Sequence, residues 1–161
     1  MRTKVAYFGV FTALALIFSY VESLIPIQLG IPGVKLGLAN LIIVITLYKM
    51  GIKEAYILSV IRIVLAGFMF GNLFAILYSL AGGMLSLGVM CILKRTDKFS
   101  IFGVSMAGGV FHNIGQLLMA AIVLESVSIG YYFPVLLISG LATGFVIGVI
   151  SNEMMKRLKK L

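Results

Sequence analysis

The sequence has little charge, and very little of it is negative. Of its 161 residues, 11% are charged and five are acidic, whereas 61% are hydrophobic. Soluble domains carry about 25% charged residues and 45–50% apolar ones. A soluble fold of this length could not bury so much apolar surface. The composition therefore excludes a soluble domain and predicts an integral membrane protein, with residues 1–161 forming a single transmembrane domain.

The groups that most hydrolytic and transfer reactions need are also missing. Asp97 is the only aspartate, so there is no aspartate-rich cluster of the kind that binds Mg²⁺-diphosphate in polyprenyl synthases. No Walker-type loop is present, and no Cys/His set has metal-ligand spacing. A Ser/His/Asp arrangement would have to draw on Asp97 from the wrong side of the membrane. We therefore expect no enzyme activity, no cofactor and no metal.

Cysteine is nearly absent too. The single residue, Cys91, lies in an apolar run and can form no internal disulfide, so we expect a small buried apolar side chain there. At the N-terminus, Arg2 and Lys4 precede an apolar run over residues 5–21, which is long for a signal peptide and has no small-x-small cleavage site. A retained first helix is the interpretation that fits.

What the sequence does have is six apolar runs, bounded by charges, prolines and glycines. They predict an all-α, six-transmembrane-helix bundle, since six helices of about 20 residues need about 120 residues and leave only short loops. Residues 94–98 are expected to form a loop. The helices are expected over residues 5–25, 35–50, 53–70, 72–93, 100–124 and 131–154.

The basic residues predict the orientation of this bundle. Of the 13 Lys and Arg residues, 11 fall at alternate helix ends: Arg2, Lys4, Lys49, Lys53, Lys94, Arg95, Lys98, Lys156, Arg157, Lys159 and Lys160. The positive-inside rule places such ends in the cytoplasm. An even number of helices then puts both termini in the cytoplasm, and the net charge of +8 needs no nucleic-acid partner.

Small residues recur at helical spacing in two of the predicted helices. Gly140, Gly144 and Gly148 step by four, and Gly9 and Ala13 do the same near the N-terminus. Such residues let helix backbones approach closely in lipid. They indicate either packing within the bundle or docking onto a separate membrane partner.

Polar residues gather in the predicted outer half of the bundle. Polar side chains in a membrane are costly and usually face the bundle interior. The candidate binding residues are Glu22, Lys35, Asn40, Arg62, Asn72, His112, Asn113 and Gln116. The inner halves are almost purely apolar, which favours a pocket open to the outside over a channel or an autonomous permease. The Pro/Gly-rich loop after the first helix is a candidate lid.

Each of these residues has a structural alternative. Glu22 and Lys35 could be solvated at the membrane interface, and the amides could serve interhelical hydrogen bonds alone. Arg62 is the strongest candidate, because a guanidinium near the midplane keeps its charge and needs an anionic partner. That partner is either Glu22 or a bound anionic ligand.

Four segments carry a family resemblance. They are residues 22–26 (ESLIP), 32–40 (PGVKLGLAN), 79–83 (SLAGG) and 112–116 (HNIGQ). The chain resembles the Gx transporter family, also labelled heptaprenyl diphosphate synthase component I, and the resemblance covers nearly its whole length. That family is similar to the substrate-binding S-components of energy-coupling factor (ECF) vitamin transporters.

The resemblance implies a six-helix fold in the plasma membrane of a prokaryotic cell and capture of a small solute from outside. It also implies a complex with one transmembrane coupling protein and two cytoplasmic ATPases. Small residues on the first helix, here Gly9 and Ala13, would form the docking surface as the subunit topples to release its cargo. The usual pattern there is Ala-x-x-x-Ala, from which Gly9 departs.

The resemblance leaves a second function open. The family label suggests a membrane accessory subunit of isoprenoid or menaquinone synthesis, although the residues of a prenyl synthase active site are missing. For a transport subunit, Arg62, Lys35 and His112 point to an anionic group on the solute. A vitamin, a flavin-like compound or a quinone precursor would each fit.

Overall fold

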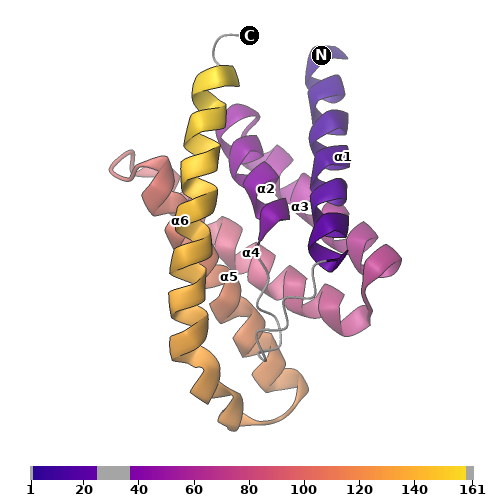
Figure 1. The fold of residues 1–161 in the computed structure, drawn as a ribbon, viewed down its shortest axis with the longest axis vertical. Helices are drawn as coiled ribbons and strands as arrows, with labels where there is room; N and C mark the ends of the chain where they lie inside the picture. Colours follow the sequence, from indigo (N-terminus) through magenta and orange to yellow (C-terminus); the bar gives the residue numbers. More distant parts are fainter. Residues whose placement is uncertain (1, 25–36, 159–161) are drawn as a thin grey trace.

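The structure, a computed structural model, describes residues 2–24 and 37–158. In this part of the chain the only regular elements are six α-helices and one short 3-10 helix (Figure 1). They are α1 (Arg2–Leu24), α2 (Leu38–Lys49), α3 (Ile52–Phe70), α4 (Leu73–Arg95), α5 (Ile101–Val123), η1 (Val127–Tyr132) and α6 (Phe133–Leu158).

The all-helical class and the number of α-helices predicted from the sequence are confirmed for the described residues, and two boundaries are wrong. Lys94 and Arg95 belong to the last turn of α4 rather than to a loop. Basic side chains in that turn are favourable because they face the negative end of the helix dipole. At the other end of the chain, residues 131–132 form the end of η1 instead of the first turn of α6.

Successive helices run in alternate directions, so their ends gather in two groups (Figure 1). Lys4 at the start of α1 pairs with Glu54 at the start of α3. Lys49 at the end of α2 donates to the carbonyl oxygen of Leu158 at the end of α6 (3.0 Å). Lys94 at the end of α4 donates to the carbonyl oxygen of Leu47 (2.6 Å). Lys4, Lys49 and Lys94 thus lie at one end of the bundle, which we call the basic end.

Four of the helices are long and apolar enough to cross a membrane by themselves. Their apolar stretches cover Lys4–Leu24, Leu73–Arg95, Ile101–Val123 and Ser128–Leu158. α3 has 19 residues but includes Lys53, Glu54 and Arg62. α2 has 12 residues, about 18 Å at 1.5 Å per residue, which is less than the roughly 30 Å of bilayer hydrocarbon.

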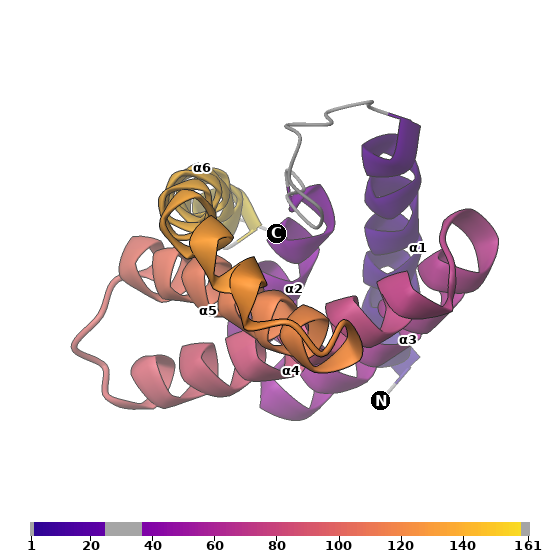
Figure 2. The same ribbon diagram turned by 90° about the horizontal axis from the view of Figure 1, so that it is seen from below.

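α2 is enclosed by other helices. It packs against α1, α3 and α6, and Figure 2 shows it between them. Every residue from Leu41 to Leu47 is buried, so both faces of the helix are covered. A helix that is hydrophobic all round belongs to an interior, and α2 forms the centre of this bundle.

Glycines bring the backbones of α4, α5 and α6 together. A Cβ on Gly115 would lie 2.7 Å from the Cα of Gly82, between α5 and α4. A Cβ on Gly109 would lie 2.2 Å from the carbonyl oxygen of Gly140, between α5 and α6. Further along α6, Gly144 approaches the backbone at Met106 in the same way. Of the two interpretations of the α6 glycines, the structure therefore supports packing within the bundle.

The apolar core fills the half of the bundle nearer the basic end. It combines most of α2 with the first turns of α3 and α5 and the last turns of α4 and α6. Cys91 is part of it, as a buried free thiol, as predicted. The opposite half contains the polar cavity described next.

Candidate functional site

A cavity of about 90 Å³ lies between five helices, toward the end of the bundle opposite the basic end. α1 and α5 contribute residues from their second halves, α2 and α4 from their first halves, and α3 from its second half. The polar residues of the wall are Ser19, Glu22, Ser23, Asn40, Arg62, Ser79, His112, Asn113 and Gln116. Polar residues that face the interior of a membrane protein often mark a functional site.

Six of the eight residues proposed from the sequence line this one cavity. They are Glu22, Asn40, Arg62, His112, Asn113 and Gln116. These six come from four different helices and are up to 94 positions apart in the chain (22 to 116). Their proximity is therefore a property of the fold and not of sequence neighbourhood.

The other two proposed residues are not part of this wall. Lys35 and the candidate lid, the Pro/Gly-rich loop, lie outside the described residues. Asn72 is exposed and forms the N-cap of α4, where its side-chain oxygen accepts a hydrogen bond from the backbone N–H of Ala75 (2.9 Å). Asn is among the best N-cap residues, so capping accounts for Asn72 without a ligand.

Among the described residues, Arg62 is the Lys or Arg that lines the cavity, and it makes no ion pair with an acidic residue. All five acidic residues lie in the described part of the chain, and none makes an ion pair with Arg62 within 4.0 Å. Its Nη2 donates to the side-chain oxygen of Asn40 (3.1 Å), and its buried Nε has no hydrogen-bond partner. A guanidinium has five N–H donors, so Arg62 retains donors for an anion in the cavity.

Glu22 is the only acidic residue lining the cavity, and it is already engaged. Its carboxylate accepts a hydrogen bond from the backbone N–H of Gly37, the N-cap residue of α2. This contact joins the end of α1 to the positive end of the α2 dipole. Glu22 also lies close enough to Arg62 to act on its charge. The described wall thus holds one carboxylate and one guanidinium, and the guanidinium has a buried N–H without a hydrogen-bond partner.

The three α5 residues have different environments. Asn113 donates from Nδ2 to the carbonyl oxygen of Leu136 (2.8 Å) and to the hydroxyl of Ser139 (3.2 Å), so it ties α5 to α6. Gln116 is buried, and its Oε1 has no hydrogen-bond partner. His112 lies one turn before Gln116 on the cavity wall. Asn113 thus makes the interhelical hydrogen bonds that were the structural alternative to ligand binding. Gln116 keeps an acceptor for a ligand.

The glycines of two motif segments set the width of the cavity. Gly82 of the 79–83 segment lies against the backbone of His112, and a Cβ there would be 2.6 Å from that carbonyl oxygen. Gly115 of the 112–116 segment lies against Gly82 and the backbone of Ala81. These contacts hold α5 close to α4 and fix where His112 and Gln116 project.

A smaller cavity of about 30 Å³ adjoins the first and shares Gly37, Asn40, His112 and Asn113 with it. Sequence reasoning missed its other polar residues, among them Ser105 of α5 and Thr143 of α6. Single Ser and Thr residues in an apolar run give no signal, because they satisfy themselves on their own helix, as Thr143 does by donating to the carbonyl oxygen of Ser139 (2.9 Å). Ser105 differs, since its buried hydroxyl has no hydrogen-bond partner.

Gly9 and Ala13, proposed as a docking surface, are both exposed on α1. A Cβ on Gly9 would meet nothing within 4 Å. The stripe continues along the helix through Ile17 and Val21, which are 54% and 38% exposed. Unlike the glycines of α6, these small residues are not used within the bundle.

The comparisons with known proteins give one match. The family model described as heptaprenyl diphosphate synthase component I matches residues 11–154. No curated protein and no solved structure gives a significant match to the chain. The matched range includes every described residue of the cavity wall, from Ser19 to Gln116. The chain therefore belongs to the heptaprenyl diphosphate synthase component I family.

Proposed function

We propose that this chain is the substrate-binding membrane subunit of an ECF-type transporter, which captures a small anionic solute from outside the cell. The observation that carries the proposal is the arrangement around Arg62. A buried cation without an ion pair faces a cavity whose other polar residues come from α1, α2, α4 and α5. Such convergence of helices on one buried guanidinium fits a binding site better than it fits five independent structural contacts.

The chemistry of the wall indicates what the solute offers. Arg62 supplies N–H donors to a carboxylate or phosphate, and Oε1 of Gln116 accepts from an N–H or O–H group. The cavity of about 90 Å³ is smaller than the roughly 300–1,000 Å³ typical of sites for drug-sized ligands. A compact anionic group with a hydrogen-bond donor nearby is what the described wall accommodates.

The position of the cavity favours capture over conduction. The half of the bundle nearer the basic end is packed with apolar side chains from Leu41–Leu47 and their neighbours. A charged solute has no polar path through that core, since each unsatisfied charge in an apolar medium is costly. Release on the other side then requires a partner that changes the position or shape of this subunit, and the exposed Gly9–Ala13 stripe is where we place its contact.

No enzymatic role is part of the proposal. Among residues 2–24 and 37–158, no group of three His, Cys, Asp or Glu side chains is placed to hold a metal ion. The cavity contains one carboxylate, and that carboxylate is bound to the start of α2.

The test is mass spectrometry of small molecules released from the purified, detergent-solubilised chain. We expect an anionic compound in near-stoichiometric amount, and co-purification of a transmembrane coupling protein with ATPases when the complex is isolated gently. A protein that is folded and monodisperse but releases no solute, from cells grown under several nutrient limitations, would remove the proposal.

A second function has support from the family description alone. In that case the chain is an accessory membrane subunit of heptaprenyl diphosphate synthesis. It predicts that adding the purified chain in vesicles to a soluble prenyl synthase subunit changes the rate or the length of the polyprenyl product. An unchanged product distribution eliminates this function.

A further inference from the structure

Another cavity, larger than the polar one, lies at the basic end of the bundle; we call it the basic-end groove. Its volume is about 520 Å³, which is within the range of ligand sites, and it is lined by Lys4, Tyr7, Phe11, Lys49, Met50 and Leu158. α1 and α6 each pack against α2 but are not a packed pair themselves. The lining residues come from the first half of α1 and from the ends of α2 and α6. The ends of α1 and α6 stand apart at the top of Figure 1.

The walls of this groove are of two kinds. Tyr7, Phe11 and Met50 give it an apolar surface along α1 and the end of α2. Lys4 and Lys49 place two ammonium groups at its rim. An apolar channel with cations at the end nearer the water is the pattern of an amphiphile site, in which a chain lies along the apolar wall and a negative head group meets the lysines.

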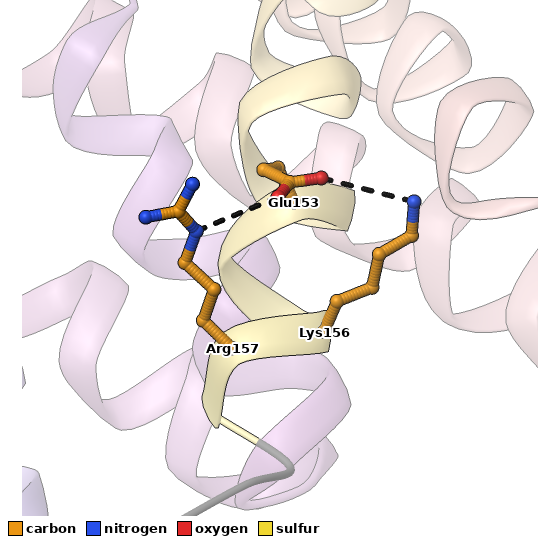
Figure 3. A network of polar contacts seen from close by, with 3 residues as sticks. All are labelled: Glu153, Lys156 and Arg157. Carbon is orange, nitrogen blue, oxygen red and sulfur yellow. Dashed lines mark hydrogen bonds and ion pairs between the residues drawn. The ribbon is translucent and has the colours of Figure 1, made fainter.

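The charge at this end is unbalanced. On α6, Glu153 forms ion pairs with both Lys156 (3.7 Å) and Arg157 (3.4 Å), as Figure 3 shows. Glu54 forms an ion pair with Lys4. Lys49 has no acidic residue within 4.0 Å, and its one hydrogen bond goes to the neutral carbonyl of Leu158. An ammonium has three donors, so Lys49 can bind a phosphate without giving up that contact.

We propose that this groove binds a phospholipid with an anionic head group, whose phosphate lies at Lys49 and Lys4 and whose acyl chain lies along Tyr7 and Phe11. The occupant is a lipid because the side chains of Tyr7 and Phe11 offer an apolar surface to an acyl chain, while Lys49 beside them offers a cation to a phosphate. It is an anionic one because the rim offers cations and no free carboxylate. The proposal does not depend on what the polar cavity near Arg62 binds.

The chain contains no tryptophan, which makes a direct test possible. Tyr7→Trp places a single indole in the groove wall, and its fluorescence in mixed vesicles is quenched by any brominated lipid that resides there. We expect brominated phosphatidylglycerol to associate about fivefold more strongly than brominated phosphatidylcholine, since one lysine near an anionic lipid contributes about 1 kcal/mol and Lys4 is already paired with Glu54, which leaves Lys49.

Three further variants locate the effect. Val10→Trp lies on the same helix, 56% exposed and outside the groove, and should be quenched equally by both lipids. Lys49→Gln in the Tyr7→Trp background should bring the preference for phosphatidylglycerol close to one. Lys98→Gln, which removes the same charge from the exposed α4–α5 connection, should leave the preference unchanged.

Three results would overturn the proposal. The first is equal quenching of Tyr7→Trp by the two lipids, and the second is a preference that survives Lys49→Gln. The third is an indole that neither lipid quenches, which would mean that a protein segment and not a lipid fills the groove. Because the readout is fluorescence of the chain alone in vesicles, none of these results depends on solute capture.

Discussion

α1 and α5 have nearly the same length, and the bundle holds them in opposite ways. α5 lies in backbone contact with α4 through Gly115 and with α6 through Gly109. In α1, between Lys4 and Leu24, Ala15 is the one fully buried residue, and the helix meets α2 and α3 through larger side chains such as Phe8 and Phe18. α5 is thus held by close backbone contacts, whereas α1 is held by side-chain contacts.

This difference matters because the polar cavity uses both helices. His112 and Gln116 project from α5, and Glu22 projects from α1. Near the cavity rim, α1 is held to α3 by the ring contact of Tyr20 with Phe70 (centroids 5.0 Å apart) and to α2 by Glu22. α5 therefore supplies the side of the wall that is held by backbone contacts, and α1 supplies the side that is held by side-chain contacts.

The largest effect on stability should come from disrupting the backbone contact between α5 and α6. Gly109→Ala puts a methyl group 2.2 Å from a backbone oxygen that cannot move away by changing a rotamer. Forcing α5 and α6 apart should destabilise the fold by about 3 kcal/mol, the upper end of the usual cost of overpacking. Thermal unfolding in detergent measures it.

Gly103→Ala is the matched control on the same helix, because its Cβ would meet Phe99 at an ordinary 3.6 Å. Ala is favoured over Gly inside a helix by about 0.5–1 kcal/mol, so this variant should melt no lower than the native chain. Equal melting temperatures for the two variants would contradict the tight contact between α5 and α6.

The next effect concerns the site and not the fold. Arg62→Ala should reduce retention of the native solute by about 30-fold or more, since removing one partner of a buried charge pair costs at least ~2 kcal/mol. Solute retained per mole of folded protein, by mass spectrometry, is the measurement. Arg95→Ala removes an exposed arginine at the basic end and should change nothing. Full retention by Arg62→Ala would refute the role assigned to this residue.

A substitution on the exposed stripe of α1 should affect docking and leave stability unchanged. Gly9→Leu should leave the melting temperature unchanged, because a side chain there meets nothing within 4 Å. It should weaken capture by a coupling protein by about tenfold, as overpacking a close helix contact costs ~1–3 kcal/mol. Co-purification yield is the readout, with Ile17→Leu on the same stripe as a volume-conserving control. A coupling protein that binds Gly9→Leu as well as the native chain would place its contact elsewhere.

The smallest effect is expected at the start of α4. Asn72→Ala removes a 2.9 Å capping bond and should lower stability by about 1 kcal/mol without affecting solute retention. Ser100→Ala, at the start of α5, removes a longer bond of 3.4 Å and should cost less. Thermal unfolding ranks the two, and a loss of retained solute with Asn72→Ala would return this residue to the binding site.

The helices were predictable from sequence because charges, prolines and glycines bound each apolar run. The gathering of Glu22, Arg62 and Gln116 was predictable because a polar residue in lipid must face inward, and residues at one depth then meet. Asn72 caps α4 instead of lining the cavity, and the sequence could not indicate this, since a side chain at a helix boundary looks the same whether it caps the helix or binds a ligand. The basic-end groove gave no sequence signal, because its walls come from the ends of three helices.

The enclosure of α2 also has a consequence for how the chain is assembled. A segment of 12 residues cannot span the hydrocarbon by itself, and a helix with no lipid-facing surface gains nothing from entering the bilayer alone. We therefore expect α2 to take its place only after the helices that enclose it, α1, α3 and α6, are in position. The part of the protein that carries Asn40 to the site would then be among the last to settle.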